Sequence, residues 1–187
     1  EVEYWDETDP SIFVKFPLSG RENEYLVIWT TTPWTLPANV AVAVNPAFIY
    51  ARVKAKKDDV EEILWIADEL IEPVLKMGRY QDYTVLERVS GSDLVGTEYT
   101  SPLAGCVPHQ AEIRHRVVAA DYVALENTGL VHIAPGHGWD DYLVGIREGL
   151  EAFCPVDAGG CFTPAAGVFA DMYVRDANEI VIDALGG

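Results

Sequence analysis

The chain has 187 residues, of which 49% are hydrophobic and 23% are charged; these values are typical of a folded domain and exclude a disordered chain. Its net charge is −17, from 30 acidic and 13 basic residues, so charge alone cannot hold a long stretch of nucleic-acid backbone. The sequence contains no run of roughly 18 or more apolar residues and begins with an acidic segment, so neither a membrane span nor a signal peptide is expected. Three cysteines, at positions 106, 154 and 161, do not make a disulfide framework and indicate reduced thiols in a cytoplasmic protein.

Short apolar runs recur between turn signals, which predicts a mainly β architecture decorated with helices. In chain order, strands are expected at residues 25–30, 40–44, 48–53, 63–67, 83–89, 117–123 and 130–134. A helix is expected to be capped by Asp68 and to stop at Gly78. Two more are expected from Trp139 to before Gly149 and over residues 176–185. Because strands and helices do not alternate regularly, a closed or partly closed barrel fits better than a doubly wound sheet.

The first segment with chemical character is WTTTPWTLPAN, residues 29–39, which follows a predicted buried strand. Threonine hydroxyls in such a place need hydrogen-bond partners, and Pro33 and Pro37 stiffen the chain around them. The segment therefore predicts a rigid loop that presents hydroxyls and backbone N–H groups to a water or a polar ligand. The alternative is an ordinary strand edge and turn, in which threonine serves only as a good strand former.

The second segment is TGLVHIAPGHGWDDY, residues 128–142. A strand delivers His132, a glycine-rich turn follows, and a helix begins with Asp140 and Asp141. The two carboxylates could act only as a cap and as a partner of the helix dipole at the start of the helix. Alternatively, a carboxylate in a pocket binds an ammonium group, and its removal from a buried site should cost roughly 2–5 kcal/mol of binding.

A metal site is a further alternative, since His132, His137, Asp140 and Asp141 are all potential ligands. Their spacing matches no standard zinc signature, so no metal is expected. The sequence also lacks a G-x-S-x-G elbow, a Walker loop and a dinucleotide fingerprint.

Together the two segments resemble the editing domain of isoleucyl-tRNA synthetases, class I aminoacyl-tRNA synthetases in which this domain is the CP1 insertion. Residues 29–39 resemble the threonine-rich editing motif, residues 131–142 look like the second editing motif, and residues 9–16 are similar to the entry strand. Valyl and leucyl enzymes differ, with Arg-Pro after the threonine pair and Pro-Ala-His-Asp in the second motif. One departure is Asn127, where the family has glycine. The H-I-G-H and K-M-S-K-S signatures of the synthetic site are absent, so residues 1–187 are expected to be a single editing domain excised from a larger synthetase.

This resemblance implies a mainly β fold with α decorations, namely the β-barrel editing domain of the valyl/isoleucyl/leucyl-tRNA synthetase type. It implies hydrolysis of valine from mischarged tRNA(Ile), because a hydrophobic pocket separates isoleucine from valine by only about 1–3 kcal/mol, a range for which isoleucyl-tRNA synthetases are themselves the standard example. The implied catalytic residues are Thr30, Thr31, Thr32 and Asp141, with Asp141 binding the α-amino group. The implied substrate-binding residues are Trp34, Thr35, Leu36, Asn39 (against the terminal adenosine), His132 (as a wall against isoleucine), Ala134, Pro135, Gly136, His137 and Asp140.

The implied partners are the 3′ end of tRNA(Ile) carrying valine and the remainder of the synthetase, with no membrane. No cofactor is expected in this domain, since ATP and magnesium belong to the parent enzyme's synthetic site. Two alternatives stay open: a non-catalytic module that binds the tRNA end or an aminoacyl-adenosine, and an editing domain of a valyl- or leucyl-type synthetase.

Overall fold

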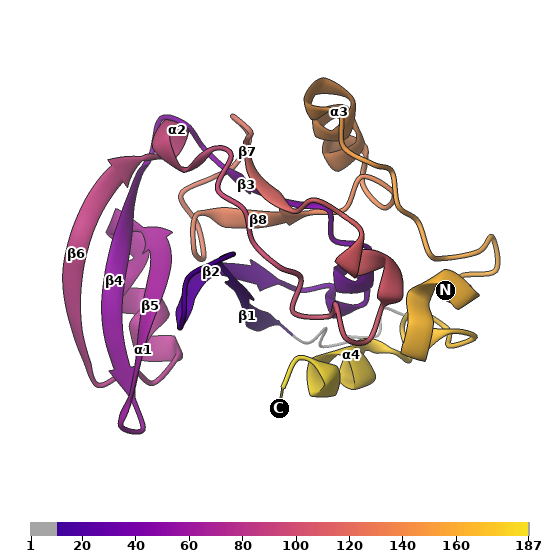
Figure 1. The fold of residues 1–187 in the computed structure, drawn as a ribbon, viewed down its shortest axis with the longest axis horizontal. Coiled ribbons are helices and arrows are strands. Elements are labelled where there is room, and N and C mark those ends of the chain that lie inside the picture. Colours follow the sequence, from indigo (N-terminus) through magenta and orange to yellow (C-terminus); the bar gives the residue numbers. More distant parts are fainter. Residues whose placement is uncertain (1–10, 187) are drawn as a thin grey trace, which may run out of the picture.

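The computed structural model describes residues 11–186, which form two β-sheets with short helices between and around them (Figure 1). The larger sheet has the strand order β1 (Ile12–Pro17), β2 (Glu24–Thr30), β5 (Val60–Ala67), β4 (Ile49–Lys57) and β6 (Asp82–Ser90). The smaller sheet has the order β7 (Arg116–Ala119), β3 (Ala41–Val44) and β8 (Leu130–Ile133). The helices are α1 (Ile71–Met77), α2 (Gly91–Leu94), α3 (Trp139–Glu148) and α4 (Asn178–Ala184), with 3-10 turns η1 (Pro33–Ala38), η2 (Asp68–Leu70), η3 (Pro108–Ala111) and η4 (Pro164–Phe169).

Strand β3 is the centre of the smaller sheet, and its small side chains explain how both faces are covered. Its sequence, AVAV, is fully buried. The valines face the main core, whereas the alanines face a smaller cluster that includes Val144 of α3. Strand β3 pairs in parallel with β7 and antiparallel with β8, in a register that places Val42 opposite His132. The smaller sheet thereby fixes the position of the histidine that the sequence singled out.

The larger sheet is anchored at β2 by a buried carboxylate. Glu24 is 2% exposed and accepts hydrogen bonds from Arg52, Trp65 and Arg21. Burial by itself would raise the pKa of Glu24, but the hydrogen bonds from these three donors outweigh it and lower the pKa below its usual value. The larger sheet therefore contains a charged group whose ionised form is stabilised by the fold.

Most predicted elements are confirmed, with differences at their ends. The strand expected at residues 117–123 stops at Ala119, because the chain then turns and the N–H of Val123 donates to the carbonyl of Ala120. Asp68 does not cap α1: it begins the turn η2, and the helix starts at Ile71. Strand β1 confirms the described part of the expected entry strand, while residues 9 and 10 lie outside the described residues.

The expectation of a mainly β fold with helices is confirmed. In residues 11–186, the hydrogen-bonded strand pairs form two separate sheets, so closure into a barrel stays a prediction. No helix in this described part is long and apolar enough to cross a membrane.

Candidate functional site

The two segments singled out in the sequence meet in one pocket of about 240 Å³. The end of β2 lies beside β8, so residues about 100 positions apart in the chain face each other (Figure 1). One wall comes from β2 and the loop into η1, and the other from β8 and the turn into α3. The lining residues are Trp29, Thr30, Thr32, Thr35, Val131, His132, Ala134, His137 and Asp141.

The threonine-rich loop is tied by its own side chains. The N–H of Thr32 donates to the hydroxyl of Thr30 at 3.1 Å, and the two hydroxyls lie 3.4 Å apart. The backbone N–H of Thr35 donates to the carbonyl of Thr32 at 3.1 Å, and the Thr35 hydroxyl donates to the same carbonyl at 2.9 Å. The hydroxyls of Thr30 and Thr32 therefore remain available to a ligand, whereas that of Thr35 is committed to the loop.

His132 is held through both ring nitrogens. Its Nδ1 lies 3.0 Å from the amide nitrogen of Asn39, and its Nε2 lies 2.8 Å from the hydroxyl of Thr35. Burial, with a smaller contribution from the neighbouring His137, lowers the pKa of His132 to about 4. His132 is therefore a neutral, immobilised ring at neutral pH, which suits a wall better than a proton acceptor.

Asp141 lies in the first turn of α3, and its carboxylate faces the pocket. Its Oδ2 accepts the backbone N–H of Ala134 at 3.0 Å, and its Oδ1 accepts the hydroxyl of Tyr122 at 3.3 Å. Burial raises the pKa of Asp141, while these two hydrogen bonds oppose the shift. A carboxylate has about four lone-pair positions, so capacity remains to accept a cationic donor from the pocket.

His137 supplies a buried nitrogen without a partner. Its backbone N–H closes a turn by donating to the carbonyl of Ala134 at 2.9 Å, and its ring meets that of Trp34 edge to face with centroids 5.3 Å apart. Among the described residues, its Nε2 is one of two buried side-chain nitrogen or oxygen atoms that lack a hydrogen bond, the other being Oε1 of Gln110. Buried polar atoms of this kind are rarely left unpaired in folded proteins.

Several sequence-predicted site residues do not line the pocket. Thr31 and Asp140 are exposed and are not among the lining residues. Asn39 is 0% exposed and lies behind the lining residues, where it bonds to His132. The rest also serve the framework: Trp34 supports His137, Leu36 is part of the main core, Pro135 packs against Gly145, and Gly136 lies against the backbone of Phe153.

The sequence analysis missed two lining residues and two supporting tyrosines. Trp29 and Val131 line the pocket, and the pattern of strands β2 and β8 could have indicated them, since each directly precedes a predicted site residue. Tyr99 and Tyr122 support Asn39 and Asp141 through their hydroxyls. Neither tyrosine belongs to a recognised motif, so only the fold reveals them.

The proposed metal ligands are not brought together as a metal site. Within residues 11–186, no group of three or more histidine, cysteine, aspartate or glutamate side chains has an arrangement that could hold a metal ion. The three cysteines are free thiols. The polar side chains that line the pocket are thus threonine hydroxyls, two imidazoles and one carboxylate.

Comparison with known proteins gives the family. No family model matches the chain. It is 90% identical over 186 residues, across its whole length, to an isoleucine–tRNA ligase from Methanoculleus marisnigri, and 68% identical over 188 residues to that of Methanocorpusculum labreanum. The chain belongs to the isoleucine–tRNA ligase family. It spans 18% of the length of each of these two relatives, so it corresponds to a segment of the ligase.

Solved structures show which part of a synthetase this ligase segment resembles. The CP1 domain of a leucyl-tRNA synthetase, GlLeuRS, matches with a TM-score of 0.68 over 94% of this chain and 95% of that one, at 16% identity. The editing domain of the cytosolic leucyl-tRNA synthetase of P. knowlesi matches with a TM-score of 0.57 over 74% of this chain and 62% of that one, also at 16% identity. At such identities the likeness shows the fold, which is that of a CP1 editing domain.

Proposed function

We propose that the pocket between β2 and β8 hydrolyses the ester that joins valine to the 3′ end of tRNA(Ile), and rejects isoleucine by size. The observation that carries this proposal is the meeting of a carboxylate, free hydroxyls and an immobilised neutral ring in one small pocket. Membership of the isoleucine–tRNA ligase family and the CP1-type fold support it. Residues 1–187 act in this proposal as one editing domain, on a framework that closes into a barrel.

Asp141 binds the α-ammonium group of the aminoacyl ester. Its carboxylate is held in place by Ala134 and Tyr122 and still has free lone pairs toward the pocket. A charge-assisted hydrogen bond between ammonium and carboxylate is among the stronger polar contacts, and partial burial strengthens it. Binding of the α-ammonium group would thereby orient the aminoacyl ester with its side chain toward His132.

His132 forms the wall that sets the size limit. Because both of its nitrogens are hydrogen bonded, the ring cannot turn aside for a larger side chain without losing a bond to Asn39 or Thr35. Forcing an extra methylene into a well-packed site costs typically about 1–3 kcal/mol. The pocket therefore admits the side chain of valine, whereas the larger side chain of isoleucine collides with the His132 ring.

Water is the nucleophile, positioned by the hydroxyls of Thr30 and Thr32. Its oxygen bonds to the ester carbonyl carbon, the bond from that carbon to the ribose oxygen breaks, and the proton of the water passes to the departing ribose oxygen. His132 does not take this proton, since its Nδ1 and Nε2 are both engaged. The neighbouring ribose hydroxyl of the substrate carries the proton, and positioning supplies most of the rate. No metal and no cofactor enter this scheme; ATP and magnesium would serve the synthetic site elsewhere in the ligase.

The strong negative charge limits the partner to the tip of the tRNA. With a net charge of −17, this chain repels phosphate, so the remainder of the synthetase must hold the tRNA body. Only the 3′ terminal nucleotide and its amino acid would enter the pocket.

The test is release of amino acid from valyl-tRNA(Ile) and isoleucyl-tRNA(Ile), first with this chain at high concentration and then with the whole synthetase. Fast loss of valine with isoleucine retained is the expected result. Binding of a valyl-adenosine analogue without turnover, in the whole synthetase as well, would replace the proposal by a non-catalytic module that binds the tRNA end.

A further inference from the structure

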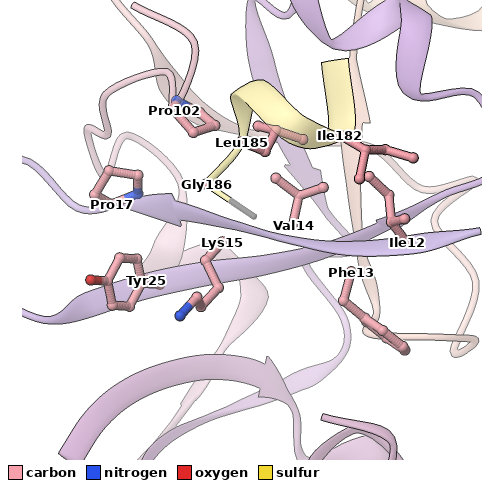
Figure 2. A pocket seen from close by; sticks show the side chains of 10 residues that line it. All are labelled: Ile12, Phe13, Val14, Lys15, Pro17, Tyr25, Pro102, Ile182, Leu185 and Gly186. Carbon is pink, nitrogen blue, oxygen red and sulfur yellow. The ribbon is translucent and has the colours of Figure 1, made fainter. Parts of the chain in front are cut away.

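A second cavity, of about 470 Å³, lies between strand β1 and helix α4 and is called here the β1–α4 groove (Figure 2). The side chains of Ile12 and Val14 point from β1 toward α4. Ile182 of α4 and Leu185, just after its end, lie opposite them. The groove shares no lining residue with the candidate site. It is therefore a separate, largely apolar surface, and covering such a surface is favourable.

Strand β1 is an edge strand of the larger sheet, and its backbone offers free hydrogen-bonding groups along the groove. In an antiparallel pair, alternate residues direct their N–H and C=O groups toward the partner strand, and the residues between them direct theirs away. The N–H of Leu18 donates to β2, whereas the carbonyl of Pro17 accepts the N–H of Thr100. By the same alternation, the backbone groups of Phe13 and Lys15 point away from β2. In the described part of the chain, no other strand or turn pairs with them there.

An edge with free N–H and C=O groups beside an apolar groove fits an extended peptide. The backbone of such a peptide pairs with the edge, and alternate side chains enter the groove. Native proteins usually cover edges of this kind, because they otherwise pair with other exposed strands. Charge favours a peptide over a nucleic acid: the chain carries −17, and Lys15, the one charged side chain among the described residues that line the groove, is paired with Glu62 at 2.7 Å.

The ligase itself supplies a peptide at the right place. This chain spans 18% of the ligase of Methanoculleus marisnigri, so most of that polypeptide lies outside the matched stretch. Ile12, next to the first described residue, and Gly186, the last one, both line the groove. A ligase segment that adjoins residues 1–187 therefore starts close to the groove. A short tether gives such a segment an effective concentration of about millimolar, which favours it over a second copy of the protein.

We propose that the β1–α4 groove binds an extended segment of the ligase from outside residues 1–187, which adds to the free edge of β1 as a further strand. The inference rests on family membership and on the geometry of the groove, and it holds whether or not the candidate site hydrolyses an ester. Pairing along β1 would fix the orientation of the larger sheet relative to the rest of the ligase. The candidate site at the end of β2 would be oriented with it.

Site-specific cross-linking in the whole ligase identifies the occupant. Benzoylphenylalanine, a photoreactive amino acid, replaces Ile182 in one variant and Ile180 in the matched control. Ile180 is 42% exposed on the same helix but does not line the groove. We expect the variant at position 182 to form a cross-link, within one polypeptide, to a segment outside residues 1–187, and the control to form none. A cross-link to a second copy, to tRNA or only to residues 1–187 overturns the inference, as does an equal yield from the two positions.

Hydrogen exchange in the unaltered ligase, resolved to single amides by mass spectrometry, tests the added strand. The N–H groups of Phe13 and Lys15 have no backbone partner in residues 11–186, so they should exchange fast unless a strand is added. We expect their exchange to be slowed by roughly 100-fold or more relative to an unstructured peptide. The N–H groups of Val14 and Phe16 point toward β2 and report whether β1 is intact. Fast exchange at Phe13 and Lys15 overturns the inference.

Discussion

Replacement of Asp141 by asparagine is the sharpest test of how the pocket holds its substrate. Asparagine has the same shape and keeps an oxygen that can accept the backbone N–H of Ala134, so the local turn should be retained. What is lost is the charge opposite the α-ammonium group. Hydrogen bonds to charged groups contribute about 1.5–3 kcal/mol, which corresponds to roughly a 10- to 150-fold loss of affinity.

The assay is calorimetric binding of a non-hydrolysable valyl-adenosine analogue, with Asp140→Asn as the matched control. Asp140 belongs to the same helix turn but is exposed and does not line the pocket, so its replacement should leave affinity unchanged. A second analogue without the α-amino group should bind the unaltered protein as weakly as Asp141→Asn binds the first. The reasoning is refuted if Asp141→Asn and Asp140→Asn behave alike, or if removal of the amino group weakens both proteins equally.

Three further predictions concern the framework. Gly136→Ala should destabilise the fold by about 1–3 kcal/mol in urea unfolding, because its new methyl carbon would lie 2.5 Å from a backbone oxygen. Gly105→Ala is the control and should leave stability unchanged, because no atom lies within 4 Å of the new methyl carbon. Equal destabilisation by the two replacements would contradict this packing. The pKa of Glu24 is lowered by its hydrogen bonds despite burial, so its contribution to folding stability is present above the unfolded value of 4.5 and is lost as pH falls through the folded pKa. Between about pH 5 and about pH 3, the unaltered chain should therefore lose more unfolding free energy than Glu24→Gln. Parallel curves of unfolding free energy against pH for the two proteins would contradict this prediction. In a nuclear magnetic resonance titration, His132 should stay neutral down to a pKa of about 4, so its contribution to folding stability is lost as pH falls from 6.5 toward 4. His109, which is paired with a glutamate, should titrate with a pKa above 6.5. A pKa of His132 above that of His109 would refute the burial of His132.

The local features of this protein can be predicted from its sequence. Helix α3 was readable because its start lies after a glycine turn and Gly149, in the left-handed conformation, ends it. The two chemical segments were readable because threonines after a buried strand and a histidine at the end of another need polar partners. These signals depend on neighbours within a few positions, so no tertiary contact is needed to recognise them.

The tertiary structure alone decided which of these residues face the pocket and what each can do. Asn39 and Thr31 look equivalent to their neighbours in the sequence, yet one is buried as a hydrogen-bond hub and the other is exposed. The ring of His132 is held by Asn39 and Thr35, which lie 93 and 97 residues away in the sequence, and Asn39 accepts a hydrogen bond from Tyr99, 60 residues away. A hydrogen bond acts only between atoms about 3 Å apart, so no local pattern can specify such a chain of donors. It forms only because two sheets bring the end of β2, the loop before β3, strand β8 and Tyr99 to one place.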